Sequence, residues 1–176
     1  MSSKKTGVKK IAVMALFASA GLMLQYIESV AFSFGLPGER IGLANIVSVI
    51  NIFVLGGANA LAVSVLRAFV GSLLTQGAAS VVYSVAGALC SGAVMWALKE
   101  RFYPKLSEVG ISVAGAAVHN FTQLLVGSFF FSAYLIYSFL PMMLICGVLG
   151  GIITGCAARA VLKVLRQKEN GSYGFK

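Results

Sequence analysis

The chain has 176 residues and a net charge of +9, and 59% of its residues are hydrophobic while only 11% are charged. Soluble globular proteins carry about 25% charged residues, so this composition excludes an ordinary water-soluble domain and indicates a membrane protein. Backbone polar groups in lipid must be satisfied within the protein, and the long apolar segments lack strand-like alternation, which predicts helices. We expect a single membrane domain over residues 1–176.

Six transmembrane helices are predicted in an all-α integral membrane protein. Their approximate ranges are 10–30, 43–56, 58–75, 78–98, 109–131 and 138–164. Lysines before the first apolar run resemble a signal peptide, but the run is too long for one and similar segments follow it. The first segment is therefore interpreted as a retained helix. Turn residues mark the breaks, for example FGLPGERIG at 34–42 and FYPK at 102–105.

Basic residues predict the orientation of these helices. Twelve of the 14 basic residues lie at the start of the first helix, between the fourth and fifth, and from the end of the sixth to the end of the given sequence. Six spans place all three groups on one side, which the positive-inside rule makes cytoplasmic. Both termini are therefore expected in the cytoplasm, with the chain multi-pass in a prokaryotic cell (inner) membrane. The net charge is interpreted mainly as a topology signal, and nucleic-acid binding is the less favoured interpretation.

Arg67 lies midway through the third predicted helix, where a charge costs at least about 2.5–3.5 kcal/mol. Its expected partner is Glu28, near the outer end of the first helix. Two interpretations remain open. The two residues form a buried pair that fixes helix packing, or Arg67 faces a ligand with anionic or carbonyl groups.

Three further polar positions lie in the second and fourth helices. Asn45, Ser48 and Asn51 recur every three residues along the second helix, and Tyr83 lies near the outer end of the fourth. The two asparagines either contact a ligand or hold helices together by hydrogen bonds. Tyr83 is either a ligand contact or an aromatic residue at the membrane interface.

The fifth helix carries the only histidine of the chain, in the stretch GAAVHNFTQLL. His119 and Gln123 are four residues apart, and Asn120 lies about 100° around the helix from His119. This wide polar face predicts substrate binding, and the alternative is a hydrogen-bonded core histidine. One histidine without a cysteine pair does not predict a metal site, and no cofactor is expected.

The depth of the polar residues predicts the shape of the site. Gln25, Glu28, Asn45, Tyr83 and Gln123 fall in the outer halves of their helices, whereas the inner halves are nearly all aliphatic. This pattern favours a pocket open to the outside and closed beneath, and disfavours a channel.

Small residues form smooth faces on the first and sixth helices. Gly147, Gly151 and Gly155 make a GxxxGxxxG stripe, and a second group comprises Ala12, Ala15 and Ser19. Such residues let helices approach closely. Both faces are candidate partner interfaces, and packing within the chain is the alternative.

No catalytic motif is present, and the chain is not predicted to be an enzyme. It lacks a GxxxxGK[ST] phosphate-binding loop, so it does not hydrolyse ATP by itself. It contains no aspartate, which excludes an aspartate-rich magnesium–diphosphate site. It is also too short for the usual secondary transporter built from repeats.

A resemblance covers about residues 9–162. The segments that carry it are IAVMALFASAGLMLQYIES, LPGERIGLANIV, SVLRAFVGSLL, SVAGALCSG and GISVAGAAVHNFTQLLVG. They resemble the Gx transporter family, often labelled heptaprenyl diphosphate synthase component I, which is similar to the substrate-binding S components of energy-coupling factor (ECF) transporters. The resemblance implies a six-helix S-component bundle that captures a small vitamin-like or flavin-like molecule in an outward-facing pocket.

The resemblance also implies partners, namely a membrane T component and a pair of cytoplasmic ATPases. The small residues that face the T component in such systems correspond here to Ala15 and Ser19. The family label supports a competing function, an accessory membrane subunit in prenyl (heptaprenyl) diphosphate or quinone synthesis. A structural membrane scaffold is the third possibility.

Overall fold

The computed structural model describes residues 2–31, 42–130 and 133–172, and its described part contains helices and no strands. The helices are α1 (Ser2–Ala31), α2 (Asn45–Val54), α3 (Gly57–Thr75), α4 (Ala78–Phe102), α5 (Glu108–Gly127) and α6 (Ala133–Ser172). One helix therefore matches each expected range. The break expected at 34–42 lies outside the described residues, apart from Gly42.

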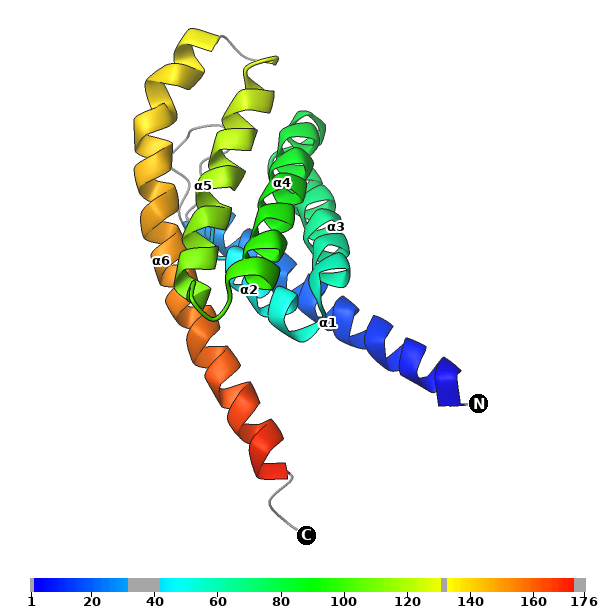
Figure 1. Cartoon of the computed structure of the whole chain (residues 1–176). Coiled ribbons are helices and arrows are strands. Elements are labelled where there is room, and N and C mark those ends of the chain that lie inside the picture. The colour runs from blue at the N-terminus through cyan, green and yellow to red at the C-terminus, as the bar shows by residue number, and fades with distance from the viewer. Residues whose placement is uncertain (1, 32–41, 131–132, 173–176) are drawn as a thin grey trace.

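The short helix α2 is at the centre of the bundle and contacts each of the other five helices. Around it, α1, α3, α4, α5 and α6 form a ring in which each helix contacts the next. Within the described residues α1 contacts only α2 and α3, so the ring is open between α1 and α6. Figure 1 shows α2 among the long helices, near the end of the bundle at which the chain begins and ends.

Five of the helices, all except α2, are long and apolar enough to cross a membrane, so the chain is a multi-pass membrane protein. The 10 residues of α2 rise only about 15 Å at 1.5 Å per residue, half of a hydrocarbon core of roughly 30 Å. The expectation of six helices is confirmed, but length alone supports five spans. A segment that does not cross the whole bilayer is tolerated where protein surrounds its backbone. The other five helices surround α2 in this way.

Apolar residues of α2 form the core at one end of the bundle. Val49, Ile50 and Ile52 are buried in a cluster with residues of α3 to α6, completed by Ala60, Met95, Ile111, Ala158 and Leu162. Close packing of this kind stabilises helix association where lipid removes the hydrophobic driving force. The short helix is held here because most of its side chains pack against the surrounding helices.

The glycine stripe of α6 packs against α5. A Cβ atom on Gly151 would lie 2.8 Å from Val113 Cα, and one on Gly155 would lie 2.7 Å from Val109 Cα. All three stripe glycines, including Gly147, are buried. The close approach of α5 thus covers the stripe within the chain, which favours the alternative interpretation of internal packing, and partner contact there stays a prediction.

The small-residue face of α1 is placed differently. Ala12, Ala15 and Ser19 are exposed, and the Ser19 hydroxyl donates to the Ala15 carbonyl at 2.9 Å within the same helix. Figure 1 shows the N-terminal half of α1 extending away from the bundle. Partner contact through this face stays a prediction.

The chain reverses so that the N-terminal end of α1, the connection between α4 and α5, and the C-terminal end of α6 share one end of the molecule (Figure 1). The connection includes Lys105, and the end of α6 includes Arg159 to Lys168. These basic residues of the connection and of α6 therefore lie toward the end at which both termini are found, and the side of the membrane that this end faces stays a prediction.

Candidate binding site

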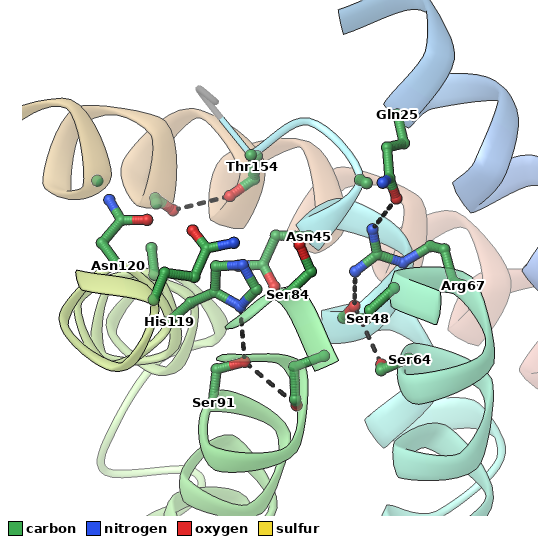
Figure 2. A pocket seen from close by; sticks show the side chains of 18 of the residues that line it. Gln25, Asn45, Ser48, Ser64, Arg67, Ser84, Ser91, His119, Asn120 and Thr154 are labelled. Atoms are coloured by element: carbon green, nitrogen blue, oxygen red, sulfur yellow. Dashed lines mark hydrogen bonds between the residues drawn. The ribbon is translucent and has the colours of Figure 1, made fainter. Parts of the chain in front are cut away.

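A polar cavity of about 60 Å³ lies inside the bundle, and all six helices contribute to its wall. Its polar lining comprises Gln25, Glu28, Asn45, Ser48, Ser64, Arg67, Ser84, Ser91, His119, Asn120, Gln123 and Thr154. Figure 2 shows two polar groups on opposite sides, one around Arg67 and one around His119, with Asn45 and Ser84 between them. Such a concentration of hydrogen-bonding groups is unusual inside an apolar helix bundle.

Arg67 joins three helices on the first side of the cavity. Its Nη1 donates to Gln25 Oε1 at 3.1 Å, and its Nη2 donates to Ser48 Oγ at 3.4 Å. Ser64 Oγ donates to the same Ser48 oxygen at 3.2 Å. Only 9% of Arg67 is exposed. Gly21 of α1 makes room for the arginine stem, because a Cβ atom there would overlap Arg67 Cδ. The guanidinium is thus oriented before any ligand arrives.

Glu28 anchors the start of α2. Its carboxylate accepts hydrogen bonds from the backbone N–H groups of Gly42 and Leu43, the latter at 3.1 Å. Gly42 has a φ of +89°, in the left-handed region that glycine tolerates best. Glu28 therefore binds α1 to the segment that enters α2, while lining the same cavity as Arg67.

His119 lies on the opposite side, on α5. Its Nδ1 is 3.4 Å from Ser91 Oγ of α4. A Cβ atom on Gly87 would lie 3.1 Å from His119 Nδ1 and 3.0 Å from Gln123 Cγ, so glycine at this position lets the polar face of α5 approach α4. Asn120 has a structural partner, because its Nδ2 donates to the Met143 carbonyl of α6 at 2.8 Å.

Two buried polar atoms at the cavity have no hydrogen-bond partner among the described residues, Gln25 Nε2 and Ser84 Oγ. Leaving such a group unpaired costs about 1–3 kcal/mol, so water or a ligand group is expected to satisfy each one. A volume of 60 Å³ has room for about two water molecules, at the roughly 30 Å³ that each occupies in the liquid. The cavity is therefore a polar space with unused hydrogen-bonding capacity.

The structure brings six of the eight predicted ligand-binding residues to one cavity, namely Glu28, Asn45, Arg67, His119, Asn120 and Gln123. Their role in binding stays a prediction.

Asn51 and Tyr83 are buried but do not line the cavity. Asn51 is nearly one turn beyond Ser48, where α2 enters the apolar core, and neither side-chain polar atom has a partner among the described residues. Tyr83 precedes Ser84, so the two side chains point about 100° apart.

Several lining residues are not among the eight predicted ligand-binding residues, namely Ser84, Ser91, Thr154 and also Gln25, which the sequence placed only in the outer polar half of its helix. A signal exists for two of them, because Ser84 and Ser91 are seven residues apart and share a helix face with Gly87. Thr154 gives no such signal. It lies at the cavity wall beside α5, where its hydroxyl is 2.9 Å from Ser112 Oγ.

The cavity can hold a molecule by hydrogen bonds and by the Arg67 guanidinium, and the Glu28 carboxylate also lies in its wall. In the described part of the chain, no three histidine, cysteine or acidic side chains gather where they could ligate a metal ion. The donor set fits recognition of a polar or anionic ligand.

A family model described as heptaprenyl diphosphate synthase component I matches residues 17–161, which include every lining residue of the cavity. The chain belongs to this family. The matched range of the heptaprenyl diphosphate synthase component I family also covers most of the six helices. No curated protein and no solved structure shows significant similarity to the chain.

Proposed function

We propose that this chain is the substrate-binding membrane subunit, or S component, of an ECF-type transporter and captures a small polar molecule within the bilayer. The observation that carries the proposal is the cavity, in which all six helices place polar groups around the preoriented Arg67. A buried ionisable side chain in a membrane helix is a strong functional indicator.

The two polar groups of the cavity define what the ligand must offer. Arg67 favours a carboxylate, phosphate or carbonyl oxygen, because a guanidinium is a planar, permanently charged donor. His119 and Gln123 then hydrogen-bond a second polar edge of the same molecule. Gln25 and Ser84 supply the donors that are unused.

A vitamin-sized or flavin-sized ligand requires the cavity to widen. Pockets for such ligands have volumes of about 300–1,000 Å³, several times the 60 Å³ here. The ring is open between α1 and α6, so these two helices can separate without loss of a direct contact. Ligand binding would then stabilise a conformation of the bundle in which the cavity is wider.

Orientation and partners follow from the same proposal. The end that carries the basic groups faces the cytoplasm under the positive-inside rule, so both termini are cytoplasmic and the cavity is loaded from the outside. A T component would contact the exposed face of Ala12, Ala15 and Ser19, and the partner ATPases would hydrolyse ATP.

The test is identification of the small molecule that co-purifies with the full chain in detergent. Arg67→Met is compared with the control Arg101→Met, which removes the same charge from an exposed position on α4. We expect ligand affinity to fall about 10- to 100-fold in Arg67→Met, the value of a charged hydrogen bond, and to be unchanged in the control. Helix content and elution volume of both variants serve as folding checks.

Other outcomes identify the competing functions. A co-purified polyprenyl chain, held equally by wild type and Arg67→Met, would favour the accessory subunit of prenyl diphosphate synthesis that the family description suggests. Reduced thermal stability of Arg67→Met without any retained ligand in the wild type would favour a structural scaffold.

A further inference from the structure

A second site candidate lies away from the central cavity, at the end of the bundle that carries the termini. An open groove there is formed by the connection between α4 and α5 and by the last turns of α6. Its wall comprises Tyr103, Pro104, Ser107, Glu108, Arg159, Lys163, Arg166 and Gln167. None of these residues lines the central cavity.

The groove has an excess of positive charge. Arg159, Lys163 and Arg166 recur at spacings of four and three, so they share one face of α6. Glu108 is the one acidic residue of the wall, so three cations against one carboxylate leave a net charge of +2. The groove therefore attracts an anion even after its internal ion pairs have formed.

The internal contacts orient Arg166 and bring Arg159 close to Glu108. Glu108, whose side chain is 7% exposed, accepts from Arg166 Nη1 at 3.2 Å and has Arg159 Nε at 3.9 Å. The Arg166 guanidinium carbon also lies 5.8 Å from the ring centroids of Phe53 and Tyr103. Groups held in this way lose little further freedom when they bind a ligand.

Lys163 is the cation that remains for a ligand. Its side chain is exposed, and the described residues provide it with no hydrogen-bond or ion-pair partner. Arg159 and Arg166 are 66% and 47% exposed at the side chain, so each still presents donors to the groove.

The position of the groove relates it to the membrane surface. The same turns of α6 expose the apolar residues Val161, Val164 and Leu165 on other sides of the helix. Apolar and basic surfaces thus meet at the end of a membrane-spanning helix, which is where the headgroups of anionic lipids lie.

We propose that this groove binds a phosphate group, with Lys163 as the principal free cation and Arg159 and Arg166 as flanking donors. Phosphate presents several acceptor oxygens and a charge of one to two, which matches the net charge of the wall. The phosphate belongs to an anionic membrane lipid or to a soluble phosphate compound. Neither source depends on the ligand of the central cavity.

The experiment measures binding to the full chain in detergent micelles. One arm titrates phosphatidylglycerol, with phosphatidylcholine as the zwitterionic reference, and follows retained lipid by native mass spectrometry. The second arm titrates inorganic diphosphate. Lys163→Gln is compared with Lys168→Gln, which removes the same charge from an exposed position of α6 outside the groove.

We expect Lys163→Gln to weaken phosphatidylglycerol binding about fivefold, the value of one lysine near an anionic surface, and Lys168→Gln to change it by less than twofold. Dependence on Lys163 in both arms identifies phosphate itself as the ligand, and dependence in the lipid arm alone identifies the headgroup. Equal losses in both variants would overturn the proposal in favour of diffuse attraction. Unchanged binding of both phosphatidylglycerol and diphosphate in Lys163→Gln would also overturn it.

Discussion

Glu28 and Arg67 line one cavity, and each has hydrogen-bond partners of its own. Glu28 accepts from the backbone N–H groups of Gly42 and Leu43, and Arg67 donates to Gln25 and Ser48. A carboxylate and a guanidinium buried in lipid are tolerated when such partners replace water. Gln25 and Ser48 therefore help to hold the Arg67 guanidinium in place at the cavity wall.

Removal of the Glu28 charge tests the connection between α1 and α2. In Glu28→Gln, one amide oxygen replaces two carboxylate oxygens, and the new NH₂ group faces a backbone donor. We expect the free energy of unfolding to fall by about 1–3 kcal/mol, measured as thermal unfolding in detergent.

Glu100→Gln is the matched control, since Glu100 is an exposed residue whose ion pair with Lys99 contributes little. An equal loss of stability in both variants would contradict the anchoring role of Glu28.

At the scale of the elements, α5 and α6 form a close helix pair because glycine occurs where a side chain would overlap the neighbouring backbone. Gly151 faces Val113 and Gly155 faces Val109. This pair also carries one wall of the cavity, since His119, Asn120 and Thr154 lie on it. Separation of the two helices would thus change both stability and the shape of the site.

Gly151→Ala is expected to destabilise the bundle, because its Cβ atom would meet Val113 Cα at 2.8 Å and force the helices apart. Overpacking of this kind costs about 1–3 kcal/mol. Thermal unfolding in detergent measures the effect.

Gly7→Ala serves as the comparison, because nothing lies within 4 Å of a Cβ atom at Gly7. That substitution should leave stability unchanged or raise it slightly through helix propensity. A Gly151→Ala variant as stable as Gly7→Ala would show that the α5–α6 contact is looser than the structure indicates.

At the scale of the whole molecule, five long helices enclose a short central one, and the basic groups gather at one end. The positive-inside rule predicts that this end faces the cytoplasm. The same orientation decides from which side the cavity is loaded and which face of the membrane holds the phosphate groove.

Cysteine labelling tests this orientation. In a background where Cys90, Cys146 and Cys156 are replaced by serine, Gln76→Cys and Lys105→Cys place thiols at exposed positions on opposite ends. A membrane-impermeant thiol reagent should label Gln76→Cys in intact cells and Lys105→Cys only after permeabilisation. The reverse pattern would place the termini outside.

Much of the fold is determined by the sequence itself. Apolar length and turn residues specify six helices, and the ranges 58–75 and 78–98 agree with α3 and α4 to within a few residues. Arg67 and His119 are identifiable from the sequence as candidate cavity residues because a polar side chain in an apolar span is costly unless it has a partner or a ligand. These signals are local, so they need no knowledge of neighbouring helices.

Only the tertiary structure decides which way each side chain faces. A helix that is apolar on all sides has no periodic stripe to mark its inner face, so Asn51 and Tyr83 could not be separated from Asn45 and Ser84. The sequence left open whether the glycine stripe of α6 packs within the chain or against a partner, and the structure brings α5 against it. The phosphate groove joins Ser107 to Lys163, far apart in the chain, and only packing brings them together.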